Sequence, residues 1–141
     1  VQVDVANTLA IDGTFVLPNS QLIPSAILSE VLPGARGSGN EIQIRTGQLV
    51  VSNGGFISAS TASAGDAGSI LIDASESAAF TGITVTPFQP SGVFVGTLRG
   101  ATGQGGTLTI NTPSLSVTNG AQLEALTESA GNAGNIILNV R

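Results

Sequence analysis

The stretch that decides the fold is GSGNEIQI, residues 37–44, in which a glycine stands five residues before an apolar-x-apolar strand. The same glycine-to-strand spacing returns three more times, and another strand of this form opens the chain. The first apolar residues of the five strands are spaced by 41, 28, 38 and 28 residues, and they are Val1, Ile42, Ile70, Leu108 and Ile136. A short structural unit therefore alternates with a long one.

A longer repeat contains these strands. Residues 34–75 align without gaps on residues 100–141, and 18 of the 42 aligned pairs are identical. The preceding segment follows the same pattern, so the units are approximately 1–33, 34–99 and 100–141 of a single repeat segment. Strands of two or three inward residues cannot bury an apolar face alone, whereas stacked coils can. The sequence therefore predicts an all-β fold, a parallel β-solenoid of about four coils that alternate between short and long.

Each short coil is expected to contain three strands separated by turns. In the coil that begins near residue 42 the strands are Ile42–Arg45, Leu49–Ser52 and Phe56–Thr61. Period-two alternation turns four of its apolar side chains inward, namely Leu49, Val51, Ile57 and Ala59. The turn Asn53-Gly54 would also suit an antiparallel hairpin, but a hairpin does not explain why the same turn returns 66 residues later.

Equivalent strands should stack as two buried columns. The first column consists of the five residues that begin the strands, from Val1 to Ile136. The second consists of the apolar residues two positions later, which are Val3, Ile44, Ile72, Ile110 and Leu138.

The composition excludes several functions. Only 9% of the residues are charged and 4% are aromatic, and the chain contains no histidine, cysteine, tryptophan or tyrosine. A net charge of −5 opposes binding to nucleic acid, which requires clustered Lys or Arg. The lack of cysteine excludes disulfides and thiolate metal sites. No apolar run reaches the roughly 18 residues of a membrane span, so we expect no membrane insertion, and no motif indicates a cofactor.

Several segments resemble the repeats of a known protein family. They are GSGNEIQI (37–44), LVVSNGG (49–55), ISAST (57–61), GDAGSILI (65–72) and PSGVF (90–94). These segments resemble the repeats of filamentous haemagglutinin-like large exoproteins of the two-partner secretion type, especially cyanobacterial ones. The resemblance implies a right-handed parallel β-helix that is secreted, is extracellular or lies at the cell surface, and serves as an adhesin or surface filament. It implies no catalytic residues.

One polar position follows each inward pair and should form a column, with the members Asp4, Arg45, Asp73, Asn111 and Asn139. Neighbouring coils stack about 4.8 Å apart, so Arg45 should lie between the carboxylates of Asp4 and Asp73. Two carboxylates about 9.6 Å apart would also resemble the acid and base of an inverting glycosidase. We favour a structural ladder, because the arginine would occupy the place of the attacking water.

A calcium site is a further candidate. Residues 65–72 are faintly similar to the glycine-rich nonapeptide of calcium-binding β-rolls. That motif needs a repeated aspartate, and the matching positions hold Ser69, Thr107 and Asn135. We therefore interpret the glycines as turn formers and expect no metal site.

The long coils contain two apolar insertions, residues 14–24 and 83–90. Their apolar side chains are Phe15, Leu17, Leu22, Ile23, Val85 and Phe88. One interpretation is that each insertion folds as a flap over the short coil. The other is a lateral contact surface for another filament, a glycan or a host surface.

The function expected from these features is structural or adhesive, as a surface filament or adhesin shaft, and not enzymatic. The alternative is a carbohydrate-active or polysaccharide-binding parallel β-helix protein. The nine acidic residues are dispersed along the chain, and no Trp or Tyr is available to stack on a sugar. Neither end of the chain offers a cap, so we expect further coils, of the same or a neighbouring chain, to stack head to tail. Surface glycans are the second partner considered.

Overall fold

The computed structural model describes residues 1–85 and 88–141, and this part of the chain is all β, with no helix. Parallel pairing joins the strands of the two larger sheets. The prediction of an all-β fold with parallel strands is therefore confirmed. The strand order of the larger sheet is β1 (Gln2–Asp12), β5 (Ile42–Ser52), β7 (Ile70–Thr81), β11 (Thr107–Thr112) and β14 (Asn135–Val140), and β12 (Leu115–Thr118) also pairs with β7.

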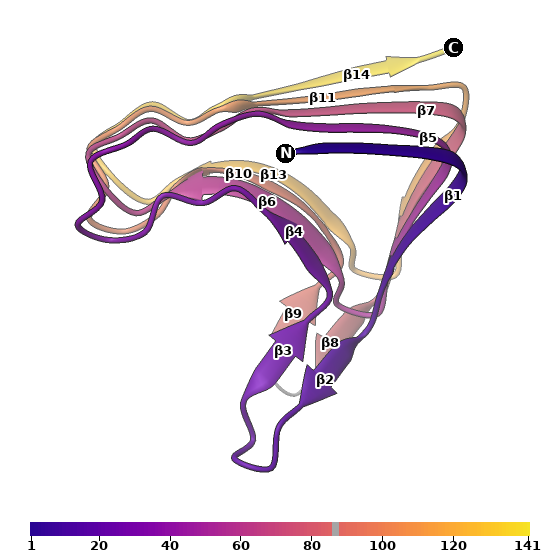
Figure 1. The fold of residues 1–141 in the computed structure, drawn as a ribbon, viewed down its shortest axis with the longest axis horizontal. Coiled ribbons are helices and arrows are strands. Elements are labelled where there is room, and N and C mark those ends of the chain that lie inside the picture. Colours follow the sequence, from indigo (N-terminus) through magenta and orange to yellow (C-terminus); the bar gives the residue numbers. More distant parts are fainter. Residues whose placement is uncertain (86–87) are drawn as a thin grey trace.

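The second sheet has four strands and lies on the other side of the apolar core (Figure 1). Its order is β13 (Gln122–Thr127), β10 (Gly92–Thr97), β6 (Phe56–Thr61) and β4 (Ala26–Leu28). Two antiparallel hairpins complete the fold: β2 (Thr14–Val16) with β3 (Leu22–Pro24), and β8 (Ile83–Val85) with β9 (Phe88–Pro90). The chain thus passes from the larger sheet to the smaller one and back, and successive passes lie on one another (Figure 1).

The strand register follows the spacing read from the sequence. The five members of the second predicted column, Val3 to Leu138, lie opposite one another on β1, β5, β7, β11 and β14. Its three middle members, Ile44, Ile72 and Ile110, are fully buried. The expectation of burial is wrong at the ends: Val1, Ile136 and Leu138 are 56%, 39% and 46% exposed, because β1 and β14 are the edge strands of the larger sheet among the described residues.

The first two strands predicted for the short coil are in fact one strand. β5 continues from Ile42 to Ser52 through Thr46-Gly47, where the register shifts against both neighbours. The larger sheet turns a corner in this region (Figure 1). The buried hydroxyl of Thr46 lies 3.0 Å from the carbonyl oxygen of Gln48 and bridges the corner. In the second short coil the equivalent strand divides into β11 and β12 at Pro113, which has no N–H to donate.

The antiparallel hairpin at Asn53-Gly54 is not formed. Both residues have positive φ, 51° and 84°, as in a tight turn. The turn joins β5 to β6, but these strands belong to different sheets and do not pair with each other. The predicted strand Phe56–Thr61 is confirmed, and the four side chains expected to point inward, Leu49, Val51, Ile57 and Ala59, are completely buried.

Candidate functional site

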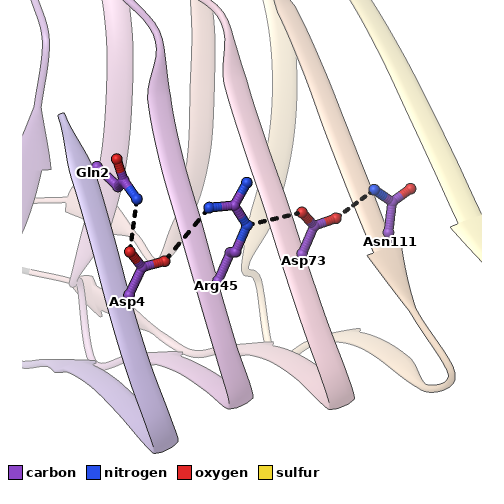
Figure 2. Close-up of polar contacts among 5 residues, drawn as sticks. All are labelled: Gln2, Asp4, Arg45, Asp73 and Asn111. Carbon is purple, nitrogen blue, oxygen red and sulfur yellow. Dashed lines mark hydrogen bonds and ion pairs between the residues drawn. The ribbon is translucent and has the colours of Figure 1, made fainter.

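The structure places the five polar residues of the predicted column in one row across the larger sheet. Asp4, Arg45, Asp73, Asn111 and Asn139 are paired in register on five successive strands. Figure 2 shows the first four side chains of this row together with that of Gln2. We call the row the polar ladder.

Ion pairs join the first three members of the polar ladder. The Nη1 atom of Arg45 lies 3.7 Å from Oδ1 of Asp4, and its Nε atom lies 4.0 Å from Oδ2 of Asp73 (Figure 2). Both distances exceed those of hydrogen bonds. About half of the Arg45 and Asp4 side-chain surface is exposed, so water screens the pairs. The guanidinium group therefore keeps donors that can bind another molecule.

Amide groups continue the polar ladder by shorter bonds. The Nδ2 atom of Asn111 donates to Oδ1 of Asp73 at 2.6 Å, and Nδ2 of Asn139 donates to Oδ1 of Asn111 at 2.7 Å. At the other end, Nε2 of Gln2 donates to Oδ2 of Asp4 at 2.7 Å. Each side chain in the row thus has a neighbour of complementary charge or hydrogen-bonding capacity.

The polar ladder forms part of a surface groove of about 840 Å³ that crosses the strands of the larger sheet. We call it the ladder groove. Its charged lining residues are two acids and two arginines, Asp4, Asp73, Arg45 and Arg141. In a chain of net charge −5, the groove is therefore locally balanced. Donors and acceptors alternate along its length at the spacing of the strands.

The apolar insertions of the long coils are hairpins and not flaps. Both extend from the same edge of the molecule, away from the sheets (Figure 1). Residues 86–87, within the second insertion, lie outside the described part of the chain. Of the six apolar side chains predicted as contacts, Leu17 and Leu22 are half-buried and the other four are exposed. The exposed fractions are 64% for Phe15, 43% for Ile23, 77% for Val85 and 65% for Phe88. Antiparallel pairing of β2 with β3 and of β8 with β9 provides backbone hydrogen bonds within each hairpin and lets it project.

Asp12, at the end of β1, anchors the first hairpin. Its Oδ1 atom accepts hydrogen bonds from the Ser52 hydroxyl at 2.6 Å and from Nδ2 of Asn53 at 2.8 Å. These two bonds, that from Ser52 first, lower the pKa of the Asp12 carboxyl below its ordinary 3.8. Asp12 therefore ties the base of the hairpin to the turn of the next coil.

A pH-dependent contribution to stability is expected from Asp12. Because its pKa is lower in the folded than in the unfolded chain, the contribution is present above about pH 3.8 and is lost as pH falls through the folded value. We expect Asp12→Asn to be less stable than the parent chain at pH 6, and the difference to shrink below pH 3.8. Urea denaturation at a series of pH values measures this. A difference that stays constant down to pH 2 would contradict it.

A small stability effect is expected from the polar ladder. Arg45→Ala should lower the free energy of unfolding by about 0–1 kcal/mol, because the ion pairs of Arg45 are long and half-exposed. Urea denaturation followed by far-UV circular dichroism measures the change. Arg99→Ala removes the same group from an exposed loop and is the matched control, expected near zero. A loss above 2 kcal/mol for Arg45→Ala alone would mean that the ladder holds the coils together.

A second pocket, which no sequence motif indicates, lies on the outer face of the four-stranded sheet. It has a volume of about 190 Å³, and its walls include Glu30, Phe56, Ser60, Phe94, Glu124 and Leu126. The rings of Phe56 and Phe94 meet edge to face, with centroids 5.9 Å apart. We call this site the phenylalanine pocket. The two phenylalanines occupy different positions in their coils, so the repeat alignment does not bring them together.

Neither a metal-binding cluster nor a membrane-spanning helix is found in the part of the chain that the structure describes. No group of three or more His, Cys, Asp and Glu side chains there could hold a metal ion, and no helix there could span a membrane. Asp66, the acid of the glycine-rich segment 65–72, accepts a hydrogen bond from the backbone N–H of Gln104 at 2.8 Å. Comparison of the chain with protein-family models, curated proteins and solved structures gives no match.

Proposed function

We propose that the chain is a segment of a right-handed parallel β-solenoid with a structural or adhesive role, as part of a secreted filament or adhesin shaft. The single observation that carries the proposal is the register: equivalent residues of five successive passes lie opposite one another on parallel strands. Such a stack has no intrinsic limit to its length, because each coil contacts only its neighbours. A rigid, extensible rod is a suitable shaft for a surface protein.

The resemblance of its repeats to those of filamentous haemagglutinin-like exoproteins supports the secreted, surface-exposed location. A low content of charged residues and many short polar side chains are consistent with stacked coils. The role proposed for the chain is not enzymatic: Asp4 and Asp73, the pair of acids closest to a glycosidase arrangement, have the guanidinium group of Arg45 within 4.0 Å of each.

The partners proposed for the chain are further coils, of the same chain or of a neighbouring copy. The outer side of β14 supports this proposal, because all six of its residues are exposed although four of them are apolar. Ile136 and Leu138 are the last members of the core columns, and a following strand would bury them. Head-to-tail addition in parallel register would extend both columns.

Electron microscopy and light scattering on the 141-residue chain test the proposal. We expect thin rods whose length grows with protein concentration. Leu138→Lys should suppress this growth, because it places a charge at the open end of the core. Asn139→Lys introduces the same charge on the adjacent, outward-facing position of β14 and is the matched control. A chain that stays monomeric at millimolar concentration, or equal loss of growth in both variants, would contradict end-to-end stacking.

A second candidate function is the binding of a neutral polysaccharide, favoured by the ladder groove. Hydroxyl groups of a sugar chain could exchange hydrogen bonds with the free donors of Arg45 and with the amides of Asn111 and Asn139. Affinity electrophoresis in gels that contain soluble β-glucan is the test. The function is supported if β-glucan slows the parent chain and Arg99→Ala but does not slow Arg45→Ala. Unchanged mobility of the parent chain would exclude β-glucan as its ligand.

A further inference from the structure

The phenylalanine pocket is a consequence of how the outward-facing residues of the four-stranded sheet line up. Val93 and Val95 of β10 point into the core and are buried, so Phe94 and Gly96 face outward. In register, Phe94 lies between Ser58 of β6 and Glu124 of β13. Gly96 lies in the next row, between Ser60 and Leu126. The missing side chain at position 96 leaves a hollow beside the Phe94 ring.

Close packing against β13 requires a glycine at position 96. A methyl group at this position would collide with the backbone carbonyl of Leu126 on the neighbouring strand. The outer face is concave (Figure 1). This shape agrees with the low exposure of Ser58 and Ser60, which are 3% and 5% exposed although they alternate with core residues and face outward. The floor of the pocket is thus sheltered from solvent.

Aromatic side chains form one part of the pocket wall. Phe56 and Phe94 contact each other edge to face, with an interplanar angle of 73°. The face of a phenyl ring carries partial negative charge and attracts cations within about 6 Å. Leu126 adds an apolar surface on the opposite strand. These walls suit an aliphatic stem that ends in a positive charge.

Carboxylates flank the aromatic wall on two sides. The Oε1 atom of Glu30 accepts a hydrogen bond from the Ser58 hydroxyl at 2.7 Å, and this bond holds its carboxylate against the pocket floor. Glu124 is the register partner of Phe94 on the other side. Within the described residues, neither Glu30 nor Glu124 takes part in an ion pair. Two negative charges and two rings therefore converge on one small hollow without a cation.

We infer that the phenylalanine pocket binds an organic cation on an apolar stem, namely the lysine or arginine side chain of a basic peptide. The methylene groups would pack on Leu126 and the phenyl rings, and the charged group would lie between Glu30 and Glu124. The net charge of −5 favours approach of a basic partner and opposes an anionic one. The pocket is formed within one chain, so this inference does not depend on end-to-end stacking.

Fluorescence anisotropy with labelled hexalysine and the full 141-residue chain tests the inference at 0.15 M salt. We expect saturable binding, and no binding of hexalysine whose side chains are all acetylated. Glu124→Gln and Phe94→Leu should each weaken binding about fivefold, since one removes a charge and the other an aromatic face. Circular dichroism confirms that each variant is folded.

Glu128→Gln is the matched control, because Glu128 is an exposed acid of the same coil that does not line the pocket. It should change the affinity less than twofold. Three results would overturn the inference: no saturable binding of hexalysine, equal weakening by Glu128→Gln and Glu124→Gln, or equal binding of acetylated hexalysine. The second would indicate attraction by overall charge, and the third an apolar slot without cation recognition.

Discussion

Replacement of Phe80 by alanine is expected to lower the free energy of unfolding by about 3–5 kcal/mol, the cost of a large cavity in a packed core. Phe80 is the largest side chain that is completely buried. It lies on β7 between Val51 of β5 and Val117 of β12, in register with both. Neither valine can fill the space without moving its strand, and each strand is fixed by its own hydrogen bonds.

The matched control is Phe15→Ala, the same substitution on a hairpin, where the ring is 64% exposed. It should change stability by less than about 0.5 kcal/mol. Urea denaturation followed by far-UV circular dichroism suits both variants, because the chain has no tryptophan. Similar midpoints for the two variants would mean that the core around Phe80 rearranges to fill the cavity.

Gly103→Ala is expected to cost about 1–3 kcal/mol through overpacking. A methyl group at this position would collide with the carbonyl oxygen of Gly65 in the preceding coil. In the same way, a methyl group at Gly65 would collide with the carbonyl oxygen of Gly37, and one at Gly131 with that of Gly103. The four glycines therefore form a column in which backbone packs on backbone. Relief of the collision requires two coils to separate, which weakens the parallel pairing on both sides.

Gly37→Ala is the control for this column and should have the opposite sign. A methyl group at Gly37 would meet no atom within 4 Å among the described residues, and its φ is not positive. The substitution restricts the unfolded chain and is expected to stabilise the fold by about 0.4–1 kcal/mol. Thermal denaturation of the two variants side by side measures the difference. Destabilisation by both would mean that the glycines serve turn geometry and not close packing.

The register could be predicted from the sequence because parallel stacking places strict demands on a few positions. Gly65, Gly103 and Gly131 cannot be replaced freely, because a methyl group at each would collide with the backbone of the preceding coil. Together with Gly37 they mark equivalent points of successive coils. The apolar strand residues begin at a constant distance from them. The polar ladder follows from the same alignment, so its five members can be predicted from the sequence alone.

The corner at Thr46-Gly47 could not be predicted, because a strand can turn without a break when a side-chain hydroxyl bridges the bend. Sequence alone left open whether the insertions fold as flaps or form a lateral surface. Apolar content favours burial, but antiparallel pairing of Phe15 with Ile23 gives the insertion backbone hydrogen bonds of its own. The phenylalanine pocket was missed because Phe56 lies opposite Gly92, and Phe94 lies opposite Ser58.

The two hairpins leave and re-enter the stack at equivalent positions, each closed by one backbone hydrogen bond. The backbone N–H of Ser25 donates to the carbonyl of Gly13 at 3.0 Å, and that of Ser91 donates to Gly82 at the same distance. The inserts between these bonds differ by three residues in length, 14–24 against 83–90, yet the strands on either side keep their register. In genetic terms, we expect in-frame insertions and deletions at this edge to alter what the surface displays and to leave the pairing of the coils unchanged. The same edge is therefore where a foreign peptide could be grafted into the chain.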